Sequence, residues 1–238
     1  MPHVFVFDCE TIPLIESSDD TAVKPLFQQI VAIAGAWINP SGVIQRLAAL
    51  GQPSWPEAEL VREFFKIVSE RHPQLVGWNS GGFDLPVLVY RAMVHGVAAP
   101  AFYLHGEPYH GYRKRYDEES HIDLMDVLSF YGASTRAKLD EMAVLLGIPG
   151  KLGVDGSQVA ELYAAGDLKT IRAYCETDVL TTALVYSRYA IHRGWWDEGQ
   201  LDSFEHSLAA LLDASSDAQW QAFRDQWRST PRRIQESP

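Results

Sequence analysis

The chain begins with the stretch that decides its fold, HVFVFDCE at residues 3–10. Residues 4–7 are all β-branched or aromatic, which is typical of a buried strand. If the strand continues through Glu10, its two-residue period places the side chains of Asp8 and Glu10 on one face. Both carboxylates then reach the same space. The alternative interpretation is a solvated strand end before a turn at residues 11–13.

A second acidic motif, NSGGFD at residues 79–84, follows another buried strand predicted over residues 73–78. Residues 83–96 then show a helical period. The apolar side of this predicted helix is expected to comprise Leu85, Leu88, Val89, Ala92 and Met93. Asp84 is therefore expected in the first turn of a helix at the edge of the sheet, where a carboxylate is also common as a plain helix cap.

The third motif, YCETD at residues 174–178, lies in a long helix predicted from Asp167 to about Gly194. Tyr174 and Asp178 are four residues apart, so their side chains stack on one face of that helix. Such a pair either serves a site beside the apolar stripe or forms a hydrogen bond at the edge of the core.

Carboxylates without a cluster of His or Cys suit hard cations that prefer oxygen ligands, such as Mg²⁺ and Mn²⁺. Two such ions held side by side are a known means of hydrolysing phosphodiesters. The three acidic motifs together therefore indicate a nuclease.

Taken in order, the motifs resemble those of the 3′–5′ exonucleases with an Asp-Glu-Asp-Asp core. FDCETIP (residues 7–13), GWN (77–79), HIDLMDVL (121–128) and PGKLGVDG (149–156) look like one subgroup. That subgroup is the stand-alone bacterial proteins related to the proofreading domain of B-family DNA polymerases. The resemblance covers roughly residues 1–195. It implies an α/β ribonuclease H-like fold, with a mixed β-sheet flanked by α-helices.

The resemblance also implies the roles of individual residues. The site would be of the tyrosine type, because Ala173 stands where the histidine type has His. Two Mg²⁺ or Mn²⁺ ions would be held by four carboxylates: Asp8, Glu10, Asp84 and Asp178. Asp8 would bridge both ions, and Tyr174 would orient the attacking water. Three residues would position the terminal nucleotide: Thr11, Asn79 and Phe83.

The formal net charge of −11 has the wrong sign for a protein that wraps duplex DNA. It favours a small footprint, such as the last few nucleotides at the free 3′ end of a single strand, or a short oligonucleotide. The basic run Arg113, Lys114 and Arg115 lies in a predicted loop, residues 105–120, that also contains tyrosines. Cations among aromatic rings suit single-stranded nucleic acid, so these three residues are predicted to bind substrate. The alternative is a solvated loop.

A length of 238 residues fits one α/β domain. We expect an exonuclease domain at residues 1–195, extra C-terminal helices at 196–228 and a disordered tail at 229–238. We expect no membrane span, no signal peptide and no polymerase domain in this chain. Its two cysteines fit a reducing compartment, so a cytoplasmic location is expected. The oligomeric state is left open.

Four further patterns complete the predicted scaffold. Residues 29–38 and 43–50 form a predicted hairpin, and a helix to about residue 70 is expected to start with a capping box at 54–57. A strand should end near Ile122, and a helix is predicted over 139–146. Residues 151–156 are either a connector or a loop that approaches substrate.

The sequence thus predicts a metal-dependent 3′–5′ exonuclease that acts on single-stranded DNA. A rival of the same chemistry is an exoribonuclease or a nuclease of short oligonucleotides. A rival of another class is a nucleic-acid-binding adaptor without activity. Four crowded acids are costly to keep without a metal, and this argues against the adaptor.

Overall fold

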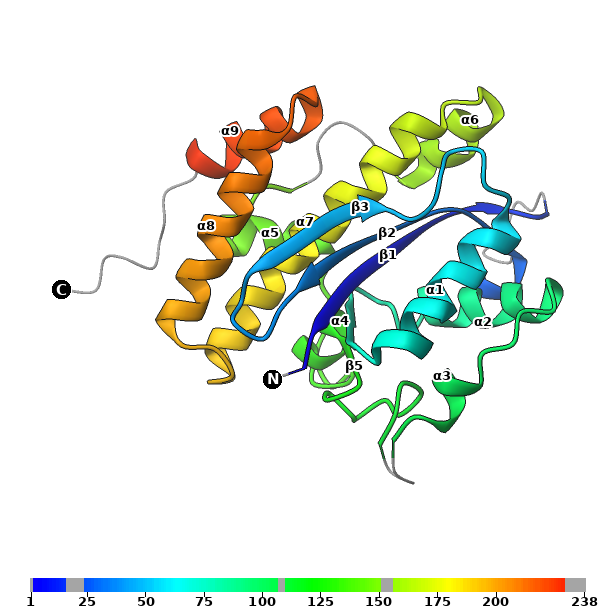
Figure 1. Ribbon diagram of the computed structural model, residues 1–238, viewed down its shortest axis with the longest axis horizontal. Helices are drawn as coiled ribbons and strands as arrows, with labels where there is room; N and C mark the ends of the chain where they lie inside the picture. The colour runs from blue at the N-terminus through cyan, green and yellow to red at the C-terminus, as the bar shows by residue number, and fades with distance from the viewer. Residues whose placement is uncertain (1, 16–23, 107–109, 151–155, 230–238) are drawn as a thin grey trace.

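The computed structural model describes residues 2–15, 24–106, 110–150 and 156–229 (Figure 1). In this part of the chain, five strands form one mixed sheet in the order β3-β2-β1-β4-β5. Their bounds are β1 Val4–Pro13, β2 Gln28–Ile38, β3 Ile44–Ala49, β4 Gln74–Gly77 and β5 His121–Asp123. β1, β2 and β3 are antiparallel neighbours, whereas β4 runs parallel to both β1 and β5.

Helices cover both faces of this sheet (Figure 1). The bounds are η1 Pro25–Phe27, α1 Glu57–Arg71, α2 Asp84–Val94, α3 Pro100–Leu104, α4 Leu124–Leu128, α5 Leu139–Leu146, η2 Gly156–Gln158, α6 Val159–Ala164, α7 Leu168–His192, α8 Glu198–Ala214 and α9 Ala218–Ser229. α1 and α2 lie on one face, and the long helix α7 crosses the other. Within the described residues, no helix is long and apolar enough to cross a membrane.

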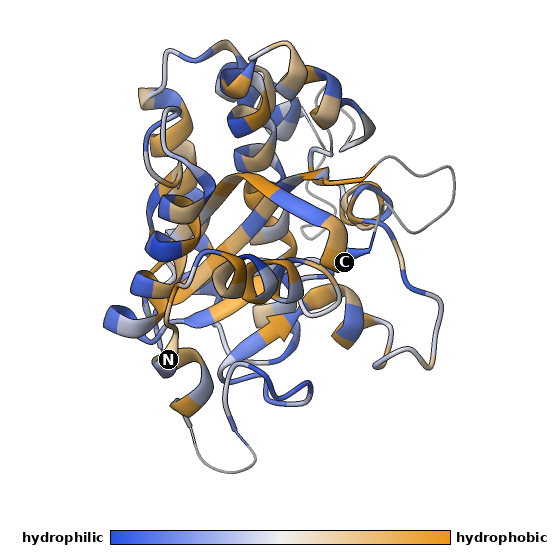
Figure 2. Ribbon diagram, turned by 90° about the vertical axis from the view of Figure 1, so that its right-hand side faces the viewer, coloured by the Kyte–Doolittle hydropathy of each residue, from blue (hydrophilic) through white to orange (hydrophobic). Residues whose placement is uncertain are grey.

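The alternating pattern of β1 divides the core in two. Val4 and Val6 belong to the apolar cluster on the α7 side, while Phe5 and Phe7 belong to the cluster on the α1 side. Figure 2 shows the strands of the sheet as mostly hydrophobic. Because Asp8 and Glu10 continue the even-numbered series, they face α7 at the end of this buried strand.

The predicted strands and long helices are confirmed, with their ends displaced by a few residues. β1 is longer than predicted and continues through the segment interpreted as a turn, residues 11–13. The prediction of the apolar face of α2 is partly wrong. Met93 is 74% exposed and Val87 is buried instead, because α2 packs against α1, β2 and η1 and its buried stripe is rotated accordingly.

The C-terminal helices pack on the same core as α7. α8 contacts α7 and β3, and its residues Phe204 and Leu208 are fully buried. The division of the chain at residue 195 stays a prediction. The predicted tail lies outside the described residues from residue 230 onward.

The predicted capping box at residues 54–57 is wrong. Pro56 is the N-cap of α1, and no side chain caps it. The Glu57 carboxylate instead accepts hydrogen bonds from the Ile30 amide (2.7 Å), from Arg91 Nε and Nη2 (2.7 and 2.6 Å) and from His95 Nε2 (2.7 Å). Burial alone would raise the pKa of Glu57, but these bonds outweigh it and lower the pKa. Glu57 therefore ties α1, β2 and α2 together.

Replacing Arg91 with Ala should destabilise the fold, since it would leave the buried Glu57 carboxylate without its main partner. We expect the free energy of unfolding, measured by urea denaturation, to fall by about 3 kcal/mol. The matched control is Arg62→Ala on the same helix as Glu57, which breaks an exposed pair with Glu59 and should cost under about 1 kcal/mol. Equal losses of stability in the two variants would contradict the bracing role of Glu57.

Candidate active site

The acidic residues of β1 meet the N-terminal half of α7. The ligand atoms of Asp8, Glu10 and Cys175 all lie within 4.8 Å of one another. The Cys175 thiol lies 3.4 Å from the Asp8 carbonyl oxygen and 3.7 Å from Asp8 Oδ2. β1 and α7 therefore bring the first and third sequence motifs together.

The second motif joins them through the backbone of β1. Asp84 is the first residue of α2, and its Oδ1 accepts a hydrogen bond from the Cys9 amide at 3.0 Å. The strand register shifts immediately after Glu10, where β2 has one extra residue opposite β1. Such irregularities are common beside functional sites because they redirect the strand. Asp84 thus contacts β1 between its two acidic residues.

The carboxylates of this site repel one another. The pKa of Asp8 is raised well above its ordinary value, first by burial and then by the nearby charges of Asp84, Glu10 and Asp178. The pKa of Asp84 is raised to about 7, mainly by burial, although the Cys9 amide opposes the shift. The other three predicted metal ligands are therefore close enough to Asp8 for their charges to raise its pKa.

The donor set fits Mg²⁺ or Mn²⁺. It consists of carboxylate oxygens, which hard divalent cations prefer, and a bound cation would remove the repulsion between them. Burial and the charge of Asp8 raise the pKa of the Cys175 thiol. Because the thiolate is the metal-binding form, a protonated Cys175 does not favour a softer metal such as zinc.

Tyr174 lies beside these carboxylates, one helical turn before Asp178. Its side chain is buried, and its hydroxyl forms a hydrogen bond with the Asp178 carboxylate. Burial and the charge of Asp178 raise the pKa of Tyr174 far above its ordinary value. A methyl group added at Gly156 would lie 3.9 Å from the Tyr174 hydroxyl. One end of the glycine-bearing loop therefore borders the site, and residues 151–155 lie outside the described chain.

Asp123, at the end of β5, stabilises the turn before Asp84 through two hydrogen bonds. Asp123 Oδ1 accepts from the Asn79 amide at 2.9 Å, and Oδ2 accepts from the Gly81 amide at 3.0 Å. Asn79 has a positive φ of 60°, a conformation that Asn tolerates better than most residues. A side chain at Gly82 would stand 2.6 Å from Asn79 Oδ1, so the amide side chain fills the place of a Cβ there.

The remaining predicted substrate residues lie around this turn and strand. Phe83 is half-buried and packs against the apolar cluster on the α1 side. Thr11 lies on β1, where its hydroxyl donates to Gln28 Oε1 at 2.8 Å. These contacts do not test the predicted roles of Phe83 and Thr11 in substrate binding, which stay predictions.

The three residues of the predicted basic run, Arg113, Lys114 and Arg115, have different surroundings in the structure. A cavity of about 540 Å³ borders the turn at residues 79–82, and Arg113 and Arg115 line it. The Arg113 guanidinium stacks on the Tyr103 ring at 4.7 Å. Arg115 is engaged by Asp126, with Nε–Oδ2 and Nη2–Oδ1 distances of 2.6 and 2.8 Å. Lys114 is exposed and is not part of this lining.

The sequence did not reveal Arg136 as part of this region. Arg136 Nη2 lies 3.0 Å from Asp126 Oδ1, so Asp126 stands between two guanidinium groups of the cavity wall. The arginines lower the pKa of Asp126, chiefly through the hydrogen bond from Arg115. Asp126 therefore offsets part of the positive charge of the cavity.

The acidic site should make the metal-free protein less stable as the pH rises. Asp84 binds its proton more tightly when folded, with a pKa of about 7 against an ordinary 3.8. Because the folded state then holds more protons, the contribution of Asp84 to stability is full below about pH 4 and is lost as the pH rises to about 7. Asp84→Asn keeps the oxygen that accepts the Cys9 amide and should show a shallower fall.

Thermal unfolding in EDTA between pH 4 and pH 8 measures this effect. Adding Mn²⁺ at pH 7 should raise the melting temperature of the wild type more than that of Asp84→Asn, because the ion binds only the folded site. Identical pH profiles for both proteins in EDTA would show that folding does not raise the pKa of Asp84.

The order of strands and the placement of α7 define a ribonuclease H-like exonuclease fold. A family B DNA polymerase from the hyperthermophilic archaeon Pyrobaculum calidifontis has a similar structure, with a TM-score of 0.59 and 24% sequence identity. The match covers 80% of this chain and 25% of the polymerase chain, so this chain spans a quarter of that protein. This likeness confirms the predicted fold class.

Residues 21–227 match the model of a family described as predicted 3′–5′ exonucleases related to the exonuclease domain of PolB. The chain therefore belongs to this family. The matched segment includes Asp84, Tyr174 and Asp178, whereas Asp8 and Glu10 precede it. No curated protein is significantly similar to this chain in sequence. That the chain is a stand-alone bacterial protein with a tyrosine-type site stays a prediction.

Proposed function

We propose that this protein is a divalent-metal-dependent 3′–5′ exonuclease that shortens single-stranded DNA from its 3′ end. The observation that carries the proposal is the convergence of four carboxylates from β1, α2 and α7, close enough to raise the pKa of Asp8. Crowded buried acids destabilise a protein unless a cation or a proton neutralises them. Membership in the exonuclease family supports the choice of reaction.

Four residues would hold two Mg²⁺ or Mn²⁺ ions: Asp8, Glu10, Asp84 and Asp178. Asp8 would be the shared ligand, Glu10 and Asp178 would complete the ion on the nucleophile side, and Asp84 would hold the other through water. When bound, such ions polarise the phosphate and supply hydroxide at neutral pH. The chain supplies the positions of these ligands through the β1 strand and the Cys9–Asp84 hydrogen bond.

Tyr174 would orient the attacking water through its hydroxyl. Its pKa lies far above the ordinary value near 10, so at neutral pH the hydroxyl would serve as a hydrogen-bond partner rather than as a general base. Asn79 and Phe83 would position the terminal nucleotide from the turn before Asp84. Thr11 would help to position it from β1. These assignments follow the resemblance and agree with the placement of the residues.

A single strand suits the cavity beside the site better than a duplex. Arg113 and Tyr103 offer a stacked cation and ring at its wall, which is the combination that binds unpaired bases and phosphates. The net charge of −11 disfavours a long duplex contact.

Digestion of end-labelled strands tests the activity and the role of Asp8. With Mg²⁺ or Mn²⁺, 5′-labelled single-stranded DNA should shorten into a ladder, and a 3′-terminal phosphorothioate linkage should slow the reaction. Asp8→Ala should reduce the rate by about a thousandfold or more, since it removes a ligand to both ions.

The matched control is Glu59→Ala, which removes an exposed carboxylate on α1 and should act like wild type. An Asp8→Ala enzyme within tenfold of wild type would refute the metal assignment. Faster cleavage of RNA than of DNA would instead select the exoribonuclease alternative.

Tyr174→Phe should reduce turnover about ten- to a thousandfold, because the variant cannot form the hydrogen bond to the attacking water. The affinity for Mn²⁺ should stay nearly unchanged, as titration calorimetry would show. A large decrease in Mn²⁺ binding in Tyr174→Phe would mean that the hydroxyl mainly holds Asp178 in place.

The basic run should contribute unequally to strand binding. Arg113→Ala with Lys114→Ala should raise the Michaelis constant and flatten the salt dependence of binding, by about 0.7 in log affinity per log salt for each phosphate that is no longer neutralised. Arg115→Ala should change the salt slope less, because Asp126 already neutralises Arg115. A double variant with the wild-type slope would show that the strand is held elsewhere.

A further inference from the structure

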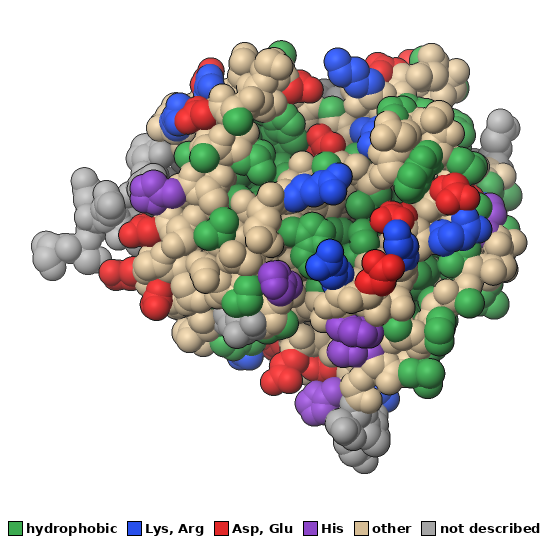
Figure 3. All heavy atoms as spheres, viewed as in Figure 1, with side chains coloured by type: hydrophobic (Ala, Val, Ile, Leu, Met, Phe, Trp, Pro, Cys, Tyr) green, Lys and Arg blue, Asp and Glu red, His purple; other side chains and the backbone are tan. Residues whose placement is uncertain are grey.

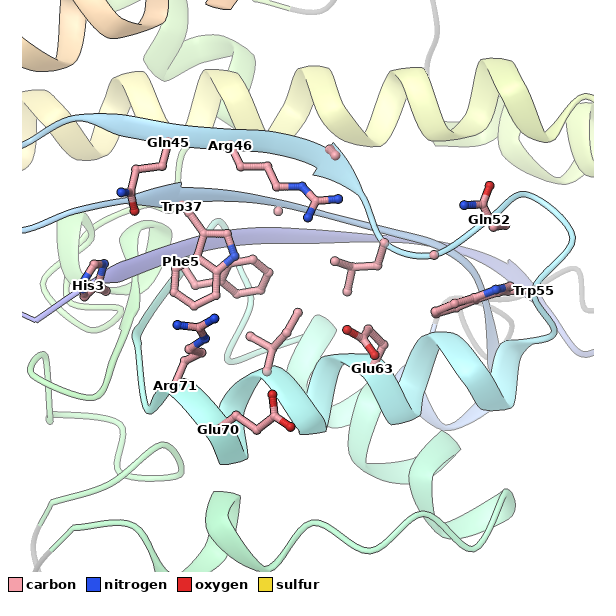
Figure 4. Close-up of a pocket in the computed structure, with 15 residues that line it drawn as sticks. His3, Phe5, Trp37, Gln45, Arg46, Gln52, Trp55, Glu63, Glu70 and Arg71 are labelled. Atoms are coloured by element: carbon pink, nitrogen blue, oxygen red, sulfur yellow. The ribbon is translucent and has the colours of Figure 1, made fainter.

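Another cavity, of about 680 Å³, lies between α1 and the strands β1, β2 and β3 (Figure 4). Phe5 and Trp37 line it from the sheet. Phe5 faces α1, whereas Asp8 and Glu10 face α7, so the sheet separates this cavity from the carboxylates. Nothing in the proposed exonuclease mechanism uses this space. Its size is typical of a site for a small molecule.

Aromatic rings stand at both ends of the cavity in fixed positions. At one end, the Trp37 ring lies 4.9 Å from the Phe5 ring. A Cβ at Gly35 would stand 2.2 Å from the Phe5 ring, so glycine makes room for this pair. At the other end, Trp55 packs over Gly51, whose added Cβ would lie 2.1 Å from the indole. The rings are therefore preformed surfaces on which a planar group can stack.

Two guanidinium groups point into the same space from opposite walls. Figure 4 shows Arg46 extending from β3 and Arg71 extending from the end of α1 toward the sheet. Figure 3 shows Lys or Arg side chains beside a hollow with hydrophobic side chains in its floor. In the described part of the chain, neither Arg46 nor Arg71 pairs with a carboxylate, although Arg62 on the same helix as Arg71 does. Two unpaired arginines in one cavity are suited to bind a phosphate group.

Carboxylates complete the lining. Glu63 and Glu70 line the cavity from α1, and Glu63 is partly neutralised by Lys66 at 3.6 Å. Carboxylates accept hydrogen bonds from sugar hydroxyls and from base amino groups. Ring surfaces, guanidinium groups and carboxylates are the three kinds of partner that a nucleotide needs.

We propose that this cavity is a nucleotide-binding site on the face of the sheet opposite the carboxylates. The base stacks on Trp37 or Trp55, the phosphate binds Arg46 and Arg71, and Glu63 accepts from the sugar or the base. The ligand is a nucleoside monophosphate, either free or as one unit of a strand. The site does not depend on the proposed exonuclease activity.

Titration calorimetry in EDTA tests the site, because the carboxylate site then holds no metal and no hydrolysis occurs. The probes are the four deoxynucleoside monophosphates, the four ribonucleoside monophosphates, a short deoxythymidine strand and inorganic phosphate. The protein for these titrations carries Arg113→Ala and Lys114→Ala, so that the cavity beside the carboxylates holds the strand only weakly. We expect saturable binding of a monophosphate or of the strand at one site. Arg46→Ala and Arg71→Ala should each weaken it about tenfold or more.

Arg62→Ala is the matched control. It removes an arginine of α1 that does not line the cavity, so it should leave this binding unchanged. Ala48→Leu keeps both arginines but fills part of the cavity, and it should also weaken binding.

Binding of the monophosphate would assign a free nucleotide, and binding of the strand alone would assign a nucleotide within a strand. The proposal is overturned if no nucleotide binds, if inorganic phosphate binds as tightly as any nucleotide, or if Arg62→Ala weakens binding as much as Arg46→Ala and Arg71→Ala do.

Discussion

The carboxylates of Asp8, Glu10, Asp84 and Asp178 are held close together although they repel one another, and the fold has to resist that repulsion. Burial removes the water that would screen these charges, and the pKa of Asp8 rises accordingly. A flexible frame would relax and separate the acids. The acids are carried by the strand β1 and by the helices α2 and α7 rather than by loops.

The frame is built from interactions between segments far apart in the sequence. The Cys9 amide binds Asp84, which joins β1 to the start of α2. Asp123 at the end of β5 holds the turn before Asp84, and Ser80 in that turn hydrogen-bonds the buried ring of His121 at 2.8 Å. Burial lowers the pKa of His121 to about 4, so this ring stays neutral and adds no charge near the acids. Neighbouring strand ends thereby fix the position of Asp84.

Local patterns allowed part of this arrangement to be predicted. The two-residue period of β1 places Asp8 and Glu10 on one face, and the four-residue spacing places Tyr174 beside Asp178. Both depend only on geometry within one element, and both elements are long and apolar. The fold class followed from the same strand and helix periods together with the resemblance.

Interactions between distant residues could not be predicted in this way. The partners of Glu57 are Arg91 and His95, 34 and 38 residues away, and they replace the local capping box that its sequence suggested. Arg115 looked like one of three equivalent cations, but Asp126 engages it. The cavity between α1 and the sheet depends on Gly35 and Gly51, whose role is visible only once the Phe5 and Trp55 rings are in place.

The most direct measurement of the central claim is anomalous X-ray diffraction from crystals soaked in Mn²⁺. The crystals contain a single strand of DNA whose 3′-terminal nucleotide cannot be hydrolysed. The account predicts two manganese peaks about 4 Å apart, with the Asp8 carboxylate contacting both. Asp8→Ala crystals treated in the same way should lack at least one of these peaks. No manganese at Asp8 in the wild type, with ions bound elsewhere on the chain, would contradict the account.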